Sequence, residues 1–198
     1  MVVGLKRSIS FDSMQGEGDW MGTYCTFIRL PGCNYRCPFC DTDFSHADVV
    51  LDTDTQHMQK HVVVTGGEPT IHPRFEELVF ALKNKGHAVH VETNGTHIHA
   101  IPEGVWITLS PKRDEWMKKP EHVTDWWNNI GRIREIKLVV DENFNPHDWI
   151  NKVPFPIWLQ PCDGPNIQAS KENILTYIKQ YPGTFKAGIQ LHKYYEVI

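Results

Sequence analysis

Three cysteines, Cys33, Cys37 and Cys40, are the residues whose types and spacing most clearly allow chemistry. Three residues separate the first two thiols, and two residues separate the second and third. Thiolates at this spacing suit three corners of a four-iron, four-sulfur cluster, whereas an ordinary electron-transfer cluster uses four cysteines. The triplet therefore predicts a cluster with one iron left open to another molecule, and chemistry at that iron.

A structural zinc site is the alternative interpretation of the same cysteines, because zinc also binds thiolates spaced as Cys-x-x-Cys. His46 or Asp41 would then supply the fourth ligand. A typical structural site would use two separated cysteine pairs, and the second pair is absent from the sequence. The chain would in that case be a non-catalytic zinc module that mediates binding.

The segment Thr65–Pro69, with the sequence Thr-Gly-Gly-Glu-Pro, is the second motif. Its two glycines allow the backbone to approach a ligand closely. Glu68 then presents a carboxylate that suits an ammonium group. The segment follows an apolar run and is expected to lie at the end of a strand.

The composition excludes several classes of protein. With 198 residues, the chain has the size of one ordinary domain, and 40% hydrophobic residues can form a core. A net charge of −4 argues against a nucleic-acid partner, which would favour a basic surface. Apolar runs are too short for a membrane span, and no signal peptide is visible. Clustered cysteines indicate a reducing cytoplasm, and Cys25 and Cys162 are expected to be buried.

Short apolar segments, several of them rich in β-branched residues, predict strands that are buried on both faces of a parallel sheet. These segments are Tyr24–Leu30, His61–Thr65, Ala88–Glu92, Val105–Leu109, Glu135–Val140, Ile157–Gln160 and Lys186–Leu191. Helical patterns cover Pro73–Lys85 and Ser170–Tyr181, with Ser170 as the N-cap, and an irregular helix is expected in Arg113–Ile130.

Alternating strands and helices predict an α/β fold, a partial and open parallel β/α barrel of about six strands that forms one domain over residues 1–198. Catalytic residues of such folds lie beyond the carboxyl ends of the strands. The residues that follow the predicted strands include Cys33, Gly66, Thr93, Ser110 and His192. Their convergence on one rim predicts a single site.

With its cysteine triplet and its Gly66-Gly67-Glu68-Pro69 segment, the chain resembles the radical S-adenosylmethionine (SAM) superfamily. The resemblance implies that SAM chelates the open iron and that one electron from the cluster cleaves its sulfonium. The resulting 5′-deoxyadenosyl radical abstracts a hydrogen atom, so the cofactor supplies the chemistry and the protein positions it.

A closer resemblance, to the 7-carboxy-7-deazaguanine synthase (QueE) family, extends over nearly the whole chain. It rests on Phe11–Gly18, Phe27–Asn34, Cys40–Thr42, Glu92–Thr96, Ser110–Lys112, Leu159–Pro161 and Gln190–Tyr194. The implied substrate is 6-carboxy-5,6,7,8-tetrahydropterin. The radical would take its C6 hydrogen, the ring would contract, ammonia would leave and SAM would be regenerated, which yields 7-carboxy-7-deazaguanine.

The family resemblance also implies residue roles. Arg29 would bind the substrate carboxylate, a pairing that suits a bidentate guanidinium, and Glu17 would accept hydrogen bonds from the guanidine-like edge of the pterin. Other substrate contacts would come from Met14, Gln15, Gly16, Thr93, His192 and the terminal carboxylate of Ile198. SAM would be bound by Phe39, Cys40, Asp41, Glu68, Gly95, Ser110, Pro111, Lys112 and Gln160. Thr42 would ligate Mg²⁺, which prefers oxygen ligands.

The expected partners follow from the same resemblance: a pterin substrate, an electron donor such as a flavodoxin-type protein, and a second copy of the chain in a homodimer. A glycyl-radical activase shares the cysteine spacing and remains an alternative. The Gln15–Glu17 segment and the ending around His192 argue against that alternative.

Overall fold

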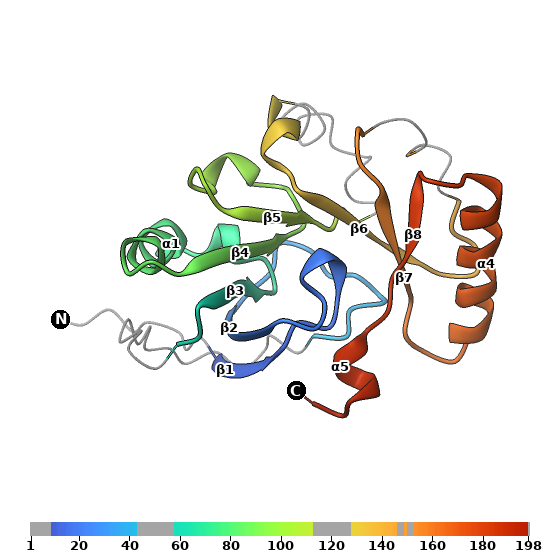
Figure 1. Ribbon diagram of the computed structural model, residues 1–198, viewed down its shortest axis with the longest axis horizontal. Helices are drawn as coiled ribbons and strands as arrows, with labels where there is room; N and C mark the ends of the chain where they lie inside the picture. The colour runs from blue at the N-terminus through green and yellow to red at the C-terminus, as the bar shows by residue number, and fades with distance from the viewer. Residues whose placement is uncertain (1–8, 43–57, 113–127, 146–148, 150–152, 198) are drawn as a thin grey trace.

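The computed structural model describes residues 9–42, 58–112, 128–145, 149 and 153–197. Within these ranges one sheet of eight strands runs in the order β1 to β8, as Figure 1 shows. The strands are β1 (Ile9–Met14), β2 (Tyr24–Leu30), β3 (His61–Gly66), β4 (Ala88–Thr93), β5 (Trp106–Leu109), β6 (Glu135–Val140), β7 (Ile157–Pro161) and β8 (Phe185–Ala187). Strand β1 is antiparallel to β2, and every later pair is parallel.

The sheet buries apolar side chains on both faces, as its nearly continuous apolar strands predict. On β3, Val62 and Val64 belong to the main core beneath helix α1 (Phe75–Asn84), whereas Val63 packs on the other face with Cys25 and Phe27. Each fully buried valine or leucine contributes about 1.5–3 kcal/mol of transfer free energy. Helices therefore cover the outer face, and the inner face is left for the site.

Two longer helices and one short helix are formed by the described residues. Helix α4 (Ile167–Gln180) packs against β7 and β8, and α5 (Leu191–Tyr194) lies near β1 in Figure 1. The 3-10 helices are η1 (Gly18–Trp20), η3 (Pro69–Ile71), η4 (Ile98–Ala100) and η5 (Ile130–Arg132). These 3-10 helices lie in the connections that follow strands or precede them.

Trp20 of η1 closes the amino-terminal end of the sheet's inner face. Its indole stands 4.9 Å from the rings of His61 and His90 and 5.9 Å from that of Trp106, measured between ring centroids. The fully buried His90 contacts Thr108 Oγ1 through Nε2 at 2.5 Å. Among the described residues, this end of the inner face is therefore filled by aromatic rings, and the cavity lies at the opposite, carboxyl-terminal rim.

The predicted α/β fold and its seven parallel strand segments are confirmed, with two differences. Strand β1 was not predicted, and with it the sheet has eight strands rather than about six. The segment predicted as the strand Lys186–Leu191 forms only the short β8, and His192 lies in helix α5 rather than at a strand end. The backbone N–H of Leu191 donates to Gly16 O at 2.9 Å, which draws the chain away from the sheet.

The helix predictions were right in position and wrong at their boundaries. Helix α1 begins at Phe75 rather than at Pro73. Helix α4 begins at Ile167, so Ser170 is not its N-cap; its hydroxyl instead donates to Asn166 O at 3.2 Å inside the first turn. Most of the predicted irregular helix Arg113–Ile130 lies outside the described residues.

Candidate active site

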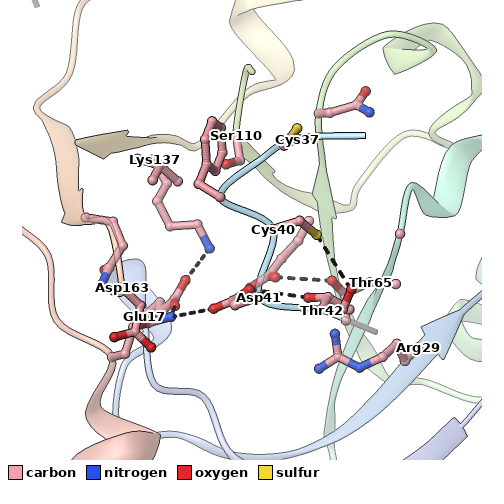
Figure 2. A pocket seen from close by; sticks show the side chains of 18 of the residues that line it. Glu17, Arg29, Cys37, Cys40, Asp41, Thr42, Thr65, Ser110, Lys137 and Asp163 are labelled. Carbon is pink, nitrogen blue, oxygen red and sulfur yellow. Dashed lines mark hydrogen bonds and ion pairs between the residues drawn. The ribbon is translucent and has the colours of Figure 1, made fainter. Parts of the chain in front are cut away.

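A cavity of about 500 Å³ opens at the carboxyl ends of the strands (Figure 2). It brings together most of the residues predicted from the sequence. Those on its lining are Met14, Gln15, Glu17, Arg29, Cys33, Cys37, Phe39, Cys40, Asp41, Thr42, Thr93, Ser110, Lys112, Gln160 and His192. The strand register explains this convergence, because Arg29 pairs with Thr65 and both lie at the same end of the sheet.

Other predicted residues do not line the cavity. Gly16, Glu68, Gly95 and Pro111 are absent from its lining, and Ile198 lies outside the described residues. Gly16 nevertheless lies directly against His192, since a Cβ atom there would stand 2.0 Å from the Nδ1 atom of the imidazole. Only glycine fits this position, so Gly16 allows the histidine ring to lie against the β1–β2 connection.

The two glycines of the Gly-Gly-Glu-Pro motif hold the cysteine loop. A Cβ atom on Gly66 would stand 1.9 Å from Leu30 O, and one on Gly67 would stand 2.1 Å from Gly32 O. The backbone N–H groups of Gly67 and Glu68 donate to Leu30 O at 3.1 Å and to Gly32 O at 2.8 Å. The close approach therefore serves backbone packing next to Cys33.

Glu68 is fully buried and its carboxylate is occupied by the protein. Oε1 accepts hydrogen bonds from the backbone N–H and the hydroxyl of Thr70 and from the Thr93 hydroxyl, at 3.1, 2.6 and 2.7 Å. Oε2 accepts the Asn94 N–H at 2.6 Å. Asn94 then donates to Asn34 Oδ1 at 2.9 Å. Glu68 thus ties the ends of β3 and β4 to the cysteine loop.

The three thiols of the triplet meet at the cavity. The Cys40 N–H donates to Cys37 O at 3.1 Å, and the Tyr35 N–H donates to Cys33 Sγ at 3.4 Å. Burial raises the pKa of Cys33, although the Tyr35 N–H opposes this. Three thiols on one loop, with positive charge at Lys112 nearby, are a donor set that fits a three-cysteine iron–sulfur cluster.

The zinc alternative gains no support from the geometry. Among the described residues, no three histidine, cysteine, aspartate or glutamate side chains are placed to hold one metal ion. Asp41, which was considered as the fourth zinc ligand, accepts hydrogen bonds from Gln190 and Lys193. His46 lies outside the described residues.

Two cations of the cavity lining lack a carboxylate partner within the described part of the chain. Arg29 stacks over the Phe11 ring, with its Cζ atom 5.9 Å from the ring centroid, and Lys112 Nζ donates to Ser110 Oγ at 3.0 Å. Burial lowers the pKa of Lys112, and the nearby positive charge of Lys137 lowers it further. Two unpaired cations in one cavity suit two anionic ligand groups.

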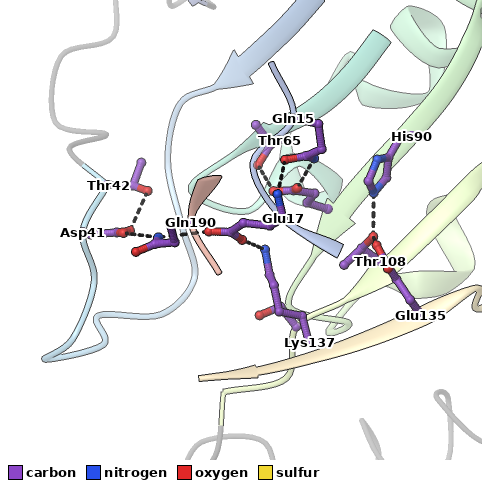
Figure 3. Close-up of polar contacts among 12 residues, drawn as sticks. Gln15, Glu17, Asp41, Thr42, Thr65, His90, Thr108, Glu135, Lys137 and Gln190 are labelled. Atoms are coloured by element: carbon purple, nitrogen blue, oxygen red, sulfur yellow. Dashed lines mark hydrogen bonds and ion pairs between the residues drawn. The ribbon is translucent and has the colours of Figure 1, made fainter. Parts of the chain in front are cut away.

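The floor of the cavity carries a charged network that Figure 3 shows. Lys137 on β6 forms an ion pair with Glu17. Glu92 Oε1 accepts from Gln15 Nε2 at 2.9 Å, and Oε2 accepts from the Thr65 hydroxyl at 3.2 Å. Burial alone would lower the pKa of Lys137, but attraction to Glu17 and Glu92 raises it above its usual value. Lys137 therefore keeps its positive charge inside the cavity.

Sequence reasoning did not identify Glu92, Lys137, Gln190 or Cys162 as parts of the site, yet all four line the cavity. A signal existed for Glu92 and Lys137, because each is an ionisable residue within an apolar strand and so needs a buried partner. Cys25 is buried as predicted, whereas the same prediction was wrong for Cys162, which is partly exposed at the cavity.

None of the described helices is long and apolar enough to cross a membrane.

Comparisons of the sequence with known proteins identify relatives of this chain. The sequence model of the radical SAM superfamily matches residues 27–140. The 7-carboxy-7-deazaguanine synthase of Synechocystis sp. is 34% identical over 202 residues, which cover 93% of this chain and 89% of that protein. That of Aquifex aeolicus is 36% identical over 148 residues, 68% of this chain and 64% of the relative.

Solved structures show the same architecture. The crystal structure of QueE from Escherichia coli superimposes with a TM-score of 0.67 at 26% identity, over 96% of this chain and 95% of that one. The crystal structure of Streptococcus suis SuiB superimposes with a TM-score of 0.51 at 14% identity, over 81% of this chain and 50% of SuiB. The second likeness concerns the fold alone.

Proposed function

Because the chain belongs to the 7-carboxy-7-deazaguanine synthase family of the radical SAM superfamily, we propose that it converts 6-carboxy-5,6,7,8-tetrahydropterin to 7-carboxy-7-deazaguanine. The reaction removes the C6 hydrogen, contracts the ring, releases ammonia and serves 7-deazapurine synthesis of the queuosine type. One observation carries the proposal: the cysteine triplet, Arg29 and Lys112 line one cavity, and neither cation has a carboxylate partner within the described residues.

Two carboxylates must be neutralised in this reaction, one on SAM and one on the pterin. Lys112 stands near the cysteines and is matched to the carboxylate of SAM. Arg29 is matched to the carboxylate of the substrate, because its planar guanidinium can donate two parallel hydrogen bonds. When the cluster and SAM are bound at Cys33, Cys37 and Cys40, they supply a radical that can abstract hydrogen.

The remaining SAM contacts are proposed for the residues between the cysteine loop and β7. Ser110 would orient the ribose together with Lys112. Gln160 is 5% exposed and its Nε2 has no hydrogen-bond partner in the described structure, so a ligand acceptor would satisfy it. Phe39 and Asp41 would line the cofactor. For Glu68, Gly95 and Pro111, which lie off the lining, we propose that they shape the loops around it.

The substrate is proposed to lie against the β1–β2 connection. Met14 and Gln15 on the lining, with Gly16 beside them, would contact the ring, and Thr93 at the end of β4 and His192 in α5 would contact it from the facing side. Glu17, which Lys137 already neutralises, retains lone pairs that can accept from the 2-amino edge of the pterin.

The metal and partner assignments complete the proposal. Thr42 would share a Mg²⁺ with the substrate carboxylate, since this ion keeps few protein ligands. A flavodoxin-type electron donor and a homodimer of this one-domain enzyme are proposed from family likeness, and the cytoplasm is proposed because it keeps the three thiols reduced.

An anaerobic assay tests the proposed function. The cluster is reconstituted, and SAM, a reductant, Mg²⁺ and the carboxytetrahydropterin are added. We expect near four irons and four sulfides per chain and a 7-carboxy-7-deazaguanine product. One zinc without sulfide would contradict the cluster, and SAM cleavage without a deazaguanine would contradict the substrate.

A further inference from the structure

The carboxyl-terminal segment around α5 contacts both the substrate segment and the cysteine loop. The Leu191 N–H donates to Gly16 O at 2.9 Å, so its backbone is fixed beside Gly16. Lys193 pairs with Asp163 Oδ2 at 2.5 Å and reaches Asp41 Oδ2 at 3.5 Å. The segment therefore lies across the boundary between two loops that are distant in sequence.

Gln190 stands at that boundary and its side-chain amide contacts both loops (Figure 3). Nε2 donates to Glu17 Oε1 at 2.9 Å and to Asp41 Oδ2 at 3.3 Å. A glutamine amide has two N–H donors, so each one can serve one carboxylate. Glutamine is the side chain of this length that can bridge two carboxylates without adding a charge of its own.

The two carboxylates belong to different parts of the site. Glu17 is held from the barrel floor by Lys137 and follows the residues proposed to contact the pterin. Asp41 lies between Cys40, a proposed cluster ligand, and Thr42, the proposed Mg²⁺ ligand. The same amide thus joins the position of the substrate segment to that of the cysteine loop.

We infer that Gln190 is a positioning residue that couples substrate binding to the order of the cysteine loop, an inference that rests on the proposed function. A ligand that fixes Glu17 also fixes Gln190, and through it Asp41. Because coupling between two sites is reciprocal, pterin should tighten SAM binding by the same factor by which SAM tightens pterin binding.

The test compares Gln190→Ala and Gln190→Glu with Gln168→Ala in cluster-loaded protein. Gln168 is a matched control, since among the described residues its amide donates to the exposed Glu172 on the surface of α4 and lies outside the cavity lining. Gln190→Ala should speed amide hydrogen exchange in the peptide 37–42 and raise the pterin KM about tenfold. Gln190→Glu should act more strongly, because it places a third carboxylate beside Glu17 and Asp41. Both variants should cleave more SAM per product formed.

Binding titrations give the decisive comparison. In the unsubstituted protein the SAM dissociation constant should fall several-fold when pterin is present, and in Gln190→Ala this difference should disappear. The inference would be overturned if both Gln190 variants still form product and show the same amide hydrogen exchange in the peptide 37–42, and the same effect of pterin on SAM binding, as the unsubstituted protein. If the unsubstituted enzyme forms no deazaguanine, the proposed function fails instead, and the exchange experiment still decides whether Gln190 orders the loop.

Discussion

Lys137 and Glu17 form an ion pair although 120 positions separate them in the sequence, and their side chains are only 11% and 14% exposed. The pair joins the inner face of β6 to the connection that follows β1. A buried charge without its partner is costly, so each side chain depends on the other. The ammonium group of Lys137 is thus one of the contacts that hold the β1–β2 connection against the floor of the cavity.

We predict that Lys137→Met lowers the free energy of unfolding by about 3 kcal/mol, because it leaves Glu17 nearly buried and unpaired. Urea denaturation measures this loss. Lys186→Met is the matched control: the Lys186–Asp19 pair is 43% and 36% exposed, and exposed pairs contribute about 1 kcal/mol or less. The Lys137→Met/Glu17→Gln double variant should recover part of the loss. An equal loss of unfolding free energy in Lys137→Met and Lys186→Met would contradict the conclusion that the buried pair is the more important one.

Arg29→Gln should raise KM for the carboxytetrahydropterin by about 10- to 100-fold, because a hydrogen bond to a charged group contributes roughly 1.5–3 kcal/mol. SAM affinity should stay unchanged. Steady-state kinetics and titration calorimetry measure the two quantities. Arg74→Gln, which disrupts only a surface pair with Glu77 on α1, should leave both unchanged. A loss of SAM binding in Arg29→Gln would indicate that the guanidinium binds the carboxylate of SAM, which would contradict its assignment to the substrate.

Cys37→Ala should abolish the cluster, whereas Cys162→Ala should retain it although Cys162 also lines the cavity. Iron and sulfide analysis and the visible absorption of the anaerobic protein provide the measurement. The reason is that three thiols on one loop complete the protein's share of a cluster with an open iron. Cluster loss in Cys162→Ala would indicate a fourth cysteine ligand and therefore a closed site.

Thr42→Ala should keep the cluster and lose much of the stimulation of turnover by Mg²⁺, since the hydroxyl is the proposed protein ligand of that ion. Turnover measured against magnesium concentration reports the effect. Thr176→Ala is the control, because the Thr176 hydroxyl donates to Glu172 O within α4, away from the cavity. An unchanged magnesium dependence in Thr42→Ala would refute the role.

Because His90 is buried, we predict that acid lowers the stability of the fold. Burial lowers its pKa from 6.5 to about 4 in the folded protein. As the pH falls from 7 to 5 the unfolded chain binds a proton at His90 and the folded chain does not, so the unfolded state is favoured. With 1.36 kcal/mol per pKa unit, this site costs about 2 kcal/mol over that window. The loss of unfolding free energy between pH 7 and pH 5 should be smaller by that amount in His90→Gln. If the stability of the two proteins falls equally with pH, His90 is not the source of the loss.

Much of the fold could be predicted because the strands are short, apolar and rich in β-branched residues. The segments Tyr24–Leu30 and Glu135–Val140 are strands with the predicted boundaries. Strand β1 was missed because Ser10, Asp12 and Ser13 break its apolar pattern, and its pairing with β2 comes from the register of the sheet.

The site could be predicted where one short segment carries the chemistry, as the cysteine loop does. It could not be predicted where contacts depend on tertiary structure. Glu68 stays a predicted ligand-binding residue, and what its local sequence did not indicate is that donors of Thr70, Thr93 and Asn94 contact its carboxylate. The partners of Lys137 and Gln190 are set by which strand ends meet, which local sequence does not specify.

In the proposed reaction this cavity directs hydrogen abstraction from C6 of the carboxytetrahydropterin, and SAM is regenerated. The most direct measurement uses substrate deuterated at C6, with mass spectrometry of SAM and product after anaerobic turnover. We expect deuterium at the 5′ position of recovered SAM and a 7-carboxy-7-deazaguanine product. Product formation without transfer of deuterium to SAM, or deuterium transfer that yields no deazaguanine, would contradict it.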